Sequence, residues 1–146
     1  MPGWLKALLI VLLVIIVLVV GVVAFGAFWF YKNKDALVAR TKAIATEARD
    51  FGRTTDNQGC VDESVSRYKA DPGFTSTISA TIFMRICLDQ SRATPGFCDD
   101  VPKAREFIKT AQWRVEQCRR VDLSHDSNCQ NLFTPIQQFC EVRRSQ

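Results

Sequence analysis

The sequence predicts an all-α protein in which a single N-terminal transmembrane helix precedes a small, disulfide-stapled helical domain built from helical hairpins. Residues 7–31 carry no charge, and fifteen of them are Leu, Ile or Val. All six cysteines follow this segment, and an even number of cysteines is typical of a disulfide framework. Between the cysteines, apolar residues recur at helical spacing and are interrupted by short turns.

The segment at residues 7–31 has the length and the flanking residues of a membrane-spanning helix. At about 1.5 Å per residue it reaches about 37 Å, more than the roughly 30 Å thickness of a bilayer's hydrocarbon core. Amphipathic rings and ammonium groups favour the headgroup layers, and those at its ends are Trp4, Lys6, Trp29, Tyr31, Lys32 and Lys34. We therefore expect a short cytoplasmic tail at residues 1–6, a transmembrane helix at residues 7–31, a juxtamembrane helical stalk and loop at residues 32–59, and a cysteine-rich helical domain at residues 60–146.

The same segment could instead be the core of a cleaved signal peptide. Ala24-Phe25-Gly26 places small residues around a possible cleavage site. A signal core is usually about 7–15 apolar residues long, whereas this apolar run begins well before the site and continues beyond it. We therefore predict an uncleaved signal anchor, and without an ionisable residue in its span we expect no ion path through it.

Small residues recur every three positions along the predicted anchor, at Gly21, Ala24 and Ala27. Such a strip lets a second transmembrane helix approach closely, which makes these residues a candidate interface. The alternative is that they face lipid in a generic anchor.

The stalk is predicted as a continuation of the anchor helix. Leu37, Thr41, Ile44, Ala48 and Phe51 form one stripe at helical spacing. We expect the helix to stop at Gly52 and a polar loop to follow over residues 53–59. The stripe favours packing on the chain's own domain over pairing with a partner helix, because two heptads are short for a coiled coil.

The first half of the domain is predicted as two helices around a turn. One helix begins at Cys60 and stops at Asp71-Pro72-Gly73, a strong turn sequence. The next covers residues 74–92, although its β-branched first half would also suit a strand. Thr94-Pro95-Gly96 then turns the chain again.

The second half is predicted as one long helix, one short helix and a last helix. Asp99, Asp100 and Pro102 are typical of a helix start. The apolar stripe of this helix is Ala104, Ile108, Ala111, Val115 and Cys118. A short helix carries Cys129, Leu132 and Phe133, and a last helix begins at Thr134-Pro135-Ile136-Gln137, which fits a capping box.

The six cysteines favour three disulfides over a metal site. They are Cys60, Cys87, Cys98, Cys118, Cys129 and Cys140. Zinc sites use close ligand pairs that this chain lacks. Fifteen pairings are possible, and short loops between helices favour Cys87 with Cys98 and Cys118 with Cys129, which leaves Cys60 with Cys140. The alternative is buried free thiols in a reducing compartment.

The cysteines and the charges disagree about orientation. Disulfides persist in an oxidising space, which places the domain in the periplasm of a bacterium and the N-terminus in the cytoplasm. The basic residues just after the anchor favour the opposite orientation under the positive-inside rule. Because long segments translocate largely regardless of charge, we follow the cysteines and expect a single-pass protein of the bacterial inner membrane.

No motif predicts catalysis, a cofactor or a metal. Ser124-His125-Asp126 holds triad residue types, but adjacent residues do not form a triad. Helix capping accounts for Asp99-Asp100. A thiol-disulfide oxidoreductase is the leading enzyme alternative, yet the chain has no C-x-x-C pair. We therefore expect a protein that is not an enzyme.

The sequence favours a role in protein contacts. Phe74, Phe97 and Trp113 are candidate interface residues, and the alternative is that they cover the edges of the core. We expect an accessory or assembly subunit of an inner-membrane protein complex, with a membrane-tethered periplasmic binding or inhibitor module as the alternative. The expected partners are the lipid bilayer and membrane proteins; the dispersed basic residues argue against nucleic acid, and no pattern indicates a small-molecule ligand.

Overall fold

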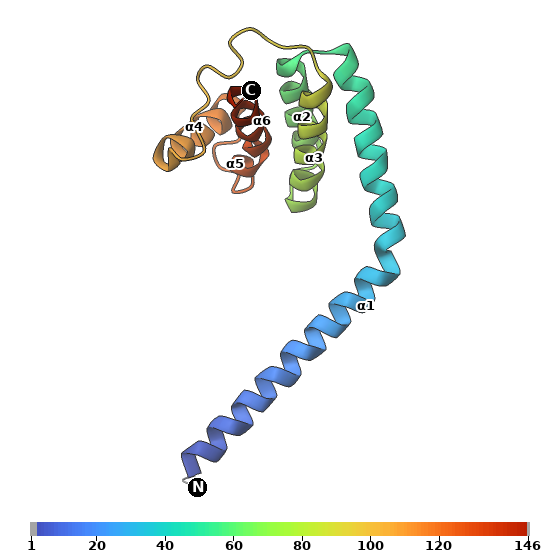
Figure 1. Ribbon diagram of the computed structural model, residues 1–146, viewed down its shortest axis with the longest axis vertical. Coiled ribbons are helices and arrows are strands. Elements are labelled where there is room, and N and C mark those ends of the chain that lie inside the picture. The colour runs from blue at the N-terminus through green and yellow to red at the C-terminus, as the bar shows by residue number, and fades with distance from the viewer. Residues whose placement is uncertain (1–2, 146) are drawn as a thin grey trace. The chain divides into compact units, whose positions relative to one another are not determined.

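The protein is all-α over residues 3–145, which a computed structural model describes. Within this range six α-helices and no β-strand are present (Figure 1). The helices are α1 (Gly3–Thr54), α2 (Asn57–Ala70), α3 (Phe74–Gln90), α4 (Phe107–Arg120), α5 (Cys129–Leu132) and α6 (Thr134–Arg144). The predicted fold class is confirmed in its helical content, its long apolar first helix and its three disulfides.

The chain divides into two compact units, residues 1–40 and residues 41–146. In the described part of the chain, α1 is the one helix that is long and apolar enough to span a membrane. Its large apolar side chains from Leu8 to Tyr31 are exposed. Of the predicted tail, residues 1 and 2 lie outside the described residues, and α1 already begins at Gly3.

The second unit includes the end of α1, because Ile44, Ala48 and Phe51 of the predicted stripe pack against the core of the domain. Leu37 of the same stripe lies in the first unit and is exposed. Ala48 is fully buried, and the ring of Phe51 lies 5.9 Å from the ring of Phe83 on α3. Gly52 does not end the helix as expected, since α1 continues to Thr54. A side chain at Gly52 would place its Cβ 2.8 Å from the Cys87 carbonyl oxygen, so glycine allows α1 and α3 to approach closely.

The predicted loop at residues 53–59 is also wrong, because α2 begins at Asn57. The carboxylate of Asp56 accepts a hydrogen bond of 2.9 Å from the Gly59 amide and caps the helix. Asn57 strengthens this junction, since its amide group donates to the Ser91 hydroxyl and accepts from the Thr94 amide. A short polar sequence therefore starts a helix here instead of forming a loop.

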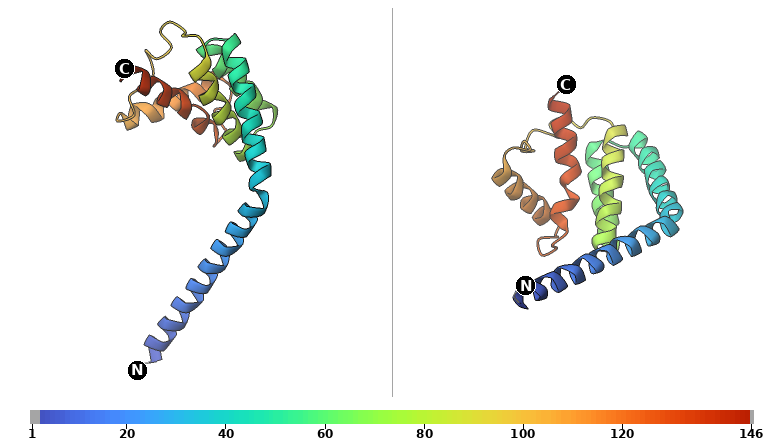
Figure 2. Two further views of the ribbon diagram at one scale, coloured as in Figure 1. Left: turned by 45° about the vertical axis from the view of Figure 1, so that its right-hand side comes forward. Right: turned by 60° about the horizontal axis from the view of Figure 1, so that its bottom comes forward.

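Helix α3 settles the choice between helix and strand at residues 74–92 in favour of a helix. The hydroxyl of Thr77 donates to the Gly73 carbonyl at 2.8 Å, and that of Thr81 donates to the Ile78 carbonyl at 2.9 Å. Threonine in a helix can satisfy its hydroxyl against the preceding turn in this way. With α2 it forms a helical hairpin, and the two helices lie side by side (Figure 2).

The start of α4 is not where the sequence indicated. Asp99 and Asp100 lie in turns and Pro102 lies in irregular chain after them, and the helix begins only at Phe107. Arg144 at the end of α6 explains this, because its guanidinium donates to the carbonyls of Cys98 and Val101. The expected turn at Thr94-Pro95-Gly96 is present, with Gly96 at φ +72°.

Helix α6 begins at Thr134 with proline in its first turn, as predicted. The capping box is absent, since no side chain caps this helix within the described residues. The side chain of Gln137 bonds instead to groups of α4 and of the segment before it.

The disulfides correct two of the three predicted pairs. Cys118–Cys129 is confirmed, whereas the other pairs are Cys60–Cys87 and Cys98–Cys140. The antiparallel α2–α3 hairpin places Cys60 beside Cys87, so Cys87 is not available to Cys98. Cys98 is held against α6 by the contacts of Arg144 and pairs with Cys140 there.

The core lies where α2, α3, α5 and α6 meet. Its largest fully buried side chains are Tyr68, Phe83, Met84, Leu88, Leu132 and Phe133. Helix α4 contributes little to this core, since Cys118 is its one buried residue among those described.

Candidate interaction surface

The candidate interface on the anchor is exposed. Gly21, Ala24 and Ala27 lie along α1 with their surfaces open, and no atom within 4 Å would meet a side chain placed at Gly21. The strip is therefore open to lipid or to another helix, and its role stays a prediction.

The three candidate aromatic residues of the domain differ in their surroundings. The side chain of Phe74 is 73% exposed at the start of α3. The ring of Phe97 instead packs edge-on against Phe139 at 6.1 Å, and that of Trp113 packs edge-on against Phe133 at 6.4 Å. Phe97 and Trp113 thus cover edges of the core, and Phe74 is the one of the three that offers a free ring.

An exposed apolar face on α4 was not expected from the sequence. The predicted stripe faces solvent: Ile108 is 76% exposed and Val115 is 52% exposed, while Phe107 beside them is 80% exposed. Cys118 alone among the stripe residues is buried. A stripe of this kind normally faces a core, so the opposite orientation needs a cause.

The cause is the buried side chain of Gln137 on α6. Its amide nitrogen donates to the Thr110 hydroxyl at 2.8 Å, and its amide oxygen accepts from the Arg114 guanidinium at 2.8 Å. Together with Trp113 against Phe133 and the Cys118–Cys129 disulfide, these contacts hold the polar side of α4 inward. The apolar side is left outside as a consequence.

A groove of about 740 Å³ lies between α4 and α6, and we call it the α4–α6 groove. Its apolar lining includes Ala104, Phe107 and Ala111 from the α4 side and Val142 from α6. Polar and charged side chains complete the lining, and they are Arg85, Thr110, Arg114, Gln130, Thr134, Gln137, Gln138 and Glu141.

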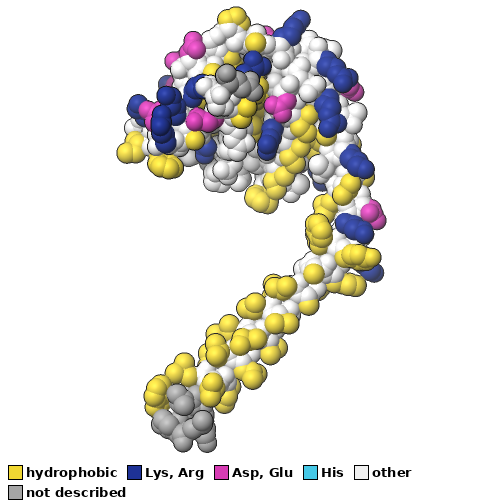
Figure 3. Space-filling model, viewed as in Figure 1, with side chains coloured by type: hydrophobic (Ala, Val, Ile, Leu, Met, Phe, Trp, Pro, Cys, Tyr) yellow, Lys and Arg dark blue, Asp and Glu magenta, His cyan; other side chains and the backbone are white. Residues whose placement is uncertain are grey.

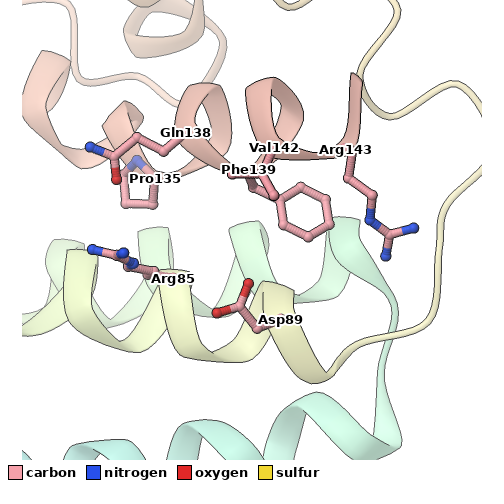
Figure 4. A pocket seen from close by; sticks show the side chains of 7 residues that line it. All are labelled: Arg85, Asp89, Pro135, Gln138, Phe139, Val142 and Arg143. Atoms are coloured by element: carbon pink, nitrogen blue, oxygen red, sulfur yellow. The ribbon is translucent and has the colours of Figure 1, made fainter. Parts of the chain in front are cut away.

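Two further hollows adjoin this groove. One, of about 470 Å³, lies between α3 and α6, where Arg85 and Asp89 of α3 lie opposite Pro135 and Phe139 (Figure 4). The other, of about 390 Å³, includes the exposed ring of Phe74. All three hollows share Arg85 and Gln138, so they form one continuous surface around α6. Hydrophobic side chains gather over α3 and at one end of α4 on this side of the domain (Figure 3).

The charges of the groove are unevenly paired. Glu141 accepts from the Ala104 amide and lies 3.7 Å from the Arg144 guanidinium. Arg85 makes no hydrogen bond or ion pair with the described residues, and the one polar partner of Arg114 among them is the neutral Gln137 amide. The buried Nε of Arg114 has no partner among the described residues, and burial lowers the pKa of this guanidinium. The groove therefore carries positive charge without a matching carboxylate on Arg85 or Arg114.

The cysteines and Asp126 have structural partners. All six cysteines form disulfides, and no three His, Cys, Asp or Glu residues among those described gather as metal ligands. In the Ser124-His125-Asp126 sequence, Asp126 accepts hydrogen bonds from the Tyr68 hydroxyl and the Asn128 amide. No protein family, curated protein or solved structure matches the chain.

Proposed function

We propose that this chain is a single-pass protein of the bacterial inner membrane that serves as an accessory or assembly subunit of a membrane protein complex. The observation that supports this most is that one chain combines a helix apolar enough to cross a bilayer with an exposed apolar face on α4. Exposed apolar patches of this kind typically mark contact sites. The chain would then act by binding and not by catalysis.

The proposed orientation places the N-terminus in the cytoplasm and the domain in the periplasm. Three disulfides support it, because such bonds form and persist in oxidising compartments. The basic residues Lys32 and Lys34 oppose it under the positive-inside rule, but long domains cross the membrane largely regardless of charge.

Purification of the full-length chain at its natural expression level in a mild detergent tests the proposal. We expect at least one integral membrane protein to co-purify in a fixed ratio. Gly21→Leu tests the candidate interface formed by Gly21, Ala24 and Ala27, and Val19→Leu is a matched control on the same helix. A chain that elutes alone, with no membrane partner, would overturn the subunit role.

A membrane-tethered periplasmic binding or inhibitor module is the second candidate. The open α4–α6 groove favours it, since the groove is built by the second unit alone. Residues 36–146, secreted without the anchor, separate the two proposals. Capture of the same partner by this fragment and by the full chain favours the tethered module, whereas capture by the full chain alone favours the subunit.

A further inference from the structure

The exposed face of α4 has the spacing of a docking site for another helix. On α4, Phe107 and Ile108, then Ala111, then Val115 follow one another at intervals of about one helical turn, and all four are exposed. Phe107 and Ala111 of this row also line the α4–α6 groove. Single exposed apolar residues are normal on protein surfaces, but a continuous row on one helix is not. A partner helix laid along such a row would contact it at every turn, as in helix-in-groove recognition.

The charges of the groove indicate what that helix carries. Arg114 lines the groove with a buried Nε that has no partner among the described residues. A half-buried cation with one unpaired N–H and no acidic partner favours a carboxylate from outside, which would pair with it through charge-assisted hydrogen bonds. Arg85 lines the same groove and is likewise without a carboxylate among the described residues. Glu141, the one acidic residue of the lining, already contacts Arg144 and the Ala104 amide.

We propose that the α4–α6 groove binds an amphipathic helix of a partner protein, with apolar residues against Phe107 and Ala111 and a carboxylate directed at Arg114 and Arg85. This inference rests on the proposed function, because it names the surface and the chemistry by which the domain would recognise another subunit. The open shape of the groove, which runs along two helices, favours a helix over a small enclosed ligand.

The test uses the full chain in phosphatidylcholine nanodiscs and fluorescent synthetic peptides of about 18 residues, long enough to form a helix on binding. One peptide carries leucines on one helical face with flanking glutamates, a second replaces the glutamates by glutamines, and a third scrambles the first. Fluorescence anisotropy measures binding, and empty nanodiscs give the background. We expect the glutamate peptide to bind at least about ten-fold more tightly than the glutamine peptide, the difference that a charge-assisted contact provides.

Variants of the groove test whether the peptide binds there and whether the arginines recognise its glutamates. Ala111→Glu places a negative charge on an exposed helix position and is expected to abolish binding of the glutamate peptide, whereas Ala111→Gln, of similar size, retains it. Replacing both arginines, Arg114→Gln with Arg85→Gln, is expected to bring the glutamate and glutamine peptides to equal affinity. Arg49→Gln, at an exposed arginine of α1 outside the groove, serves as the matched control.

Equal affinity of the charged and neutral peptides for the unaltered chain would overturn the proposal, and so would binding that Ala111→Glu leaves unchanged. If phosphatidylglycerol nanodiscs compete with the glutamate peptide for the chain, the groove binds lipid and not a partner helix. A dimer in sedimentation experiments that Ala111→Glu dissociates would assign it to a second copy of the chain. If the unaltered chain binds none of the peptides but a membrane protein still co-purifies with it, this inference is wrong and the proposed function stands.

Discussion

The Tyr68 hydroxyl donates a hydrogen bond of 2.6 Å to a carboxylate oxygen of Asp126, which joins the fully buried ring on α2 to the loop before α5. This contact lowers the pKa of Asp126 below its ordinary value of 3.8. Burial, together with the same carboxylate, raises the pKa of Tyr68. The free energy by which this contact holds α2 to the loop before α5 therefore depends on pH.

Tyr68→Phe is expected to destabilise the domain by about 1.5–3 kcal/mol at pH 7, the usual contribution of a hydrogen bond to a charged group. Because the folded-state pKa of Asp126 is depressed, its contribution is full above the unfolded value of 3.8 and is lost as pH falls through the folded value. The difference between the two proteins should therefore shrink in acid. Urea denaturation at a series of pH values measures it, with Asp122→Asn as an exposed control. A difference that is constant from neutral pH into acid would contradict the coupling.

Gly52→Ala is expected to destabilise the domain by about 1–3 kcal/mol, the range for overpacking. The added Cβ would lie 2.8 Å from the Cys87 carbonyl oxygen and 2.9 Å from the Gln90 Cβ. Gly73→Ala is the matched control, since no atom lies within 4 Å of a Cβ there. Thermal unfolding of both variants measures the effect, and equal melting temperatures would contradict the close approach of α1 and α3.

Gln137→Ala is expected to loosen α4, because it removes partners from Thr110 and from the half-buried Arg114. A polar group left unsatisfied in this way costs about 1–3 kcal/mol. Hydrogen exchange should show lower protection of the α4 amides, while α2 and α3 stay protected. Gln138→Ala, at the exposed neighbouring position, is the control. Unchanged protection of α4 would show that Gln137 does not hold this helix.

Peptide mapping without reductant should recover Cys60–Cys87, Cys98–Cys140 and Cys118–Cys129. Replacing both cysteines of Cys98–Cys140 by alanine should cost about 1 kcal/mol more than the same change at Cys118–Cys129, since a longer loop loses more chain entropy when closed. The sequence separations are 42 and 11 residues. A peptide that joins Cys60 to Cys140 would contradict the fold of both halves.

Maleimide labelling in intact cells tests the orientation. Without reductant we expect no labelling, and after a membrane-impermeant reductant we expect all six cysteines to react. A cysteine introduced as Pro2→Cys should react only after permeabilisation, because the tail would lie in the cytoplasm. Six thiols that react without reductant in permeabilised cells would place the domain in the cytoplasm.

The long apolar helix at the N-terminus and α3 could be predicted because the local sequence pattern determines them. A charge-free run over residues 7–31 has few alternatives, and the apolar positions at Ile78, Ile82 and Ile86 keep helical spacing despite their β-branched side chains. The Cys60–Cys87 pair could also have been predicted from the sequence. In a hairpin turned at Pro72, the two cysteines lie at comparable distances from the turn and so meet side by side.

The orientation of α4 could not be predicted, because it depends on partners far apart in the chain. Periodicity identifies the apolar side of a helix but not whether the core lies there. Here one buried amide, Gln137, satisfies Thr110 and Arg114 and turns the polar side inward. The α4–α6 groove was missed for the same reason, since it exists only in that orientation.

The three disulfides leave the segment between Cys87 and Cys98 unbridged. A proteolytic cut inside either closed loop leaves the pieces covalently joined, whereas a single cut at residues 91–97 does not. The cut would divide the chain into a part bearing α1 to α3 and a part bearing α4 to α6, which only noncovalent contacts would hold together, such as the packing of α3 on α6 and the Tyr68–Asp126 hydrogen bond. One protease cut in this short connection would therefore release α4 to α6, with most of the groove lining, from the part of the chain that bears α1.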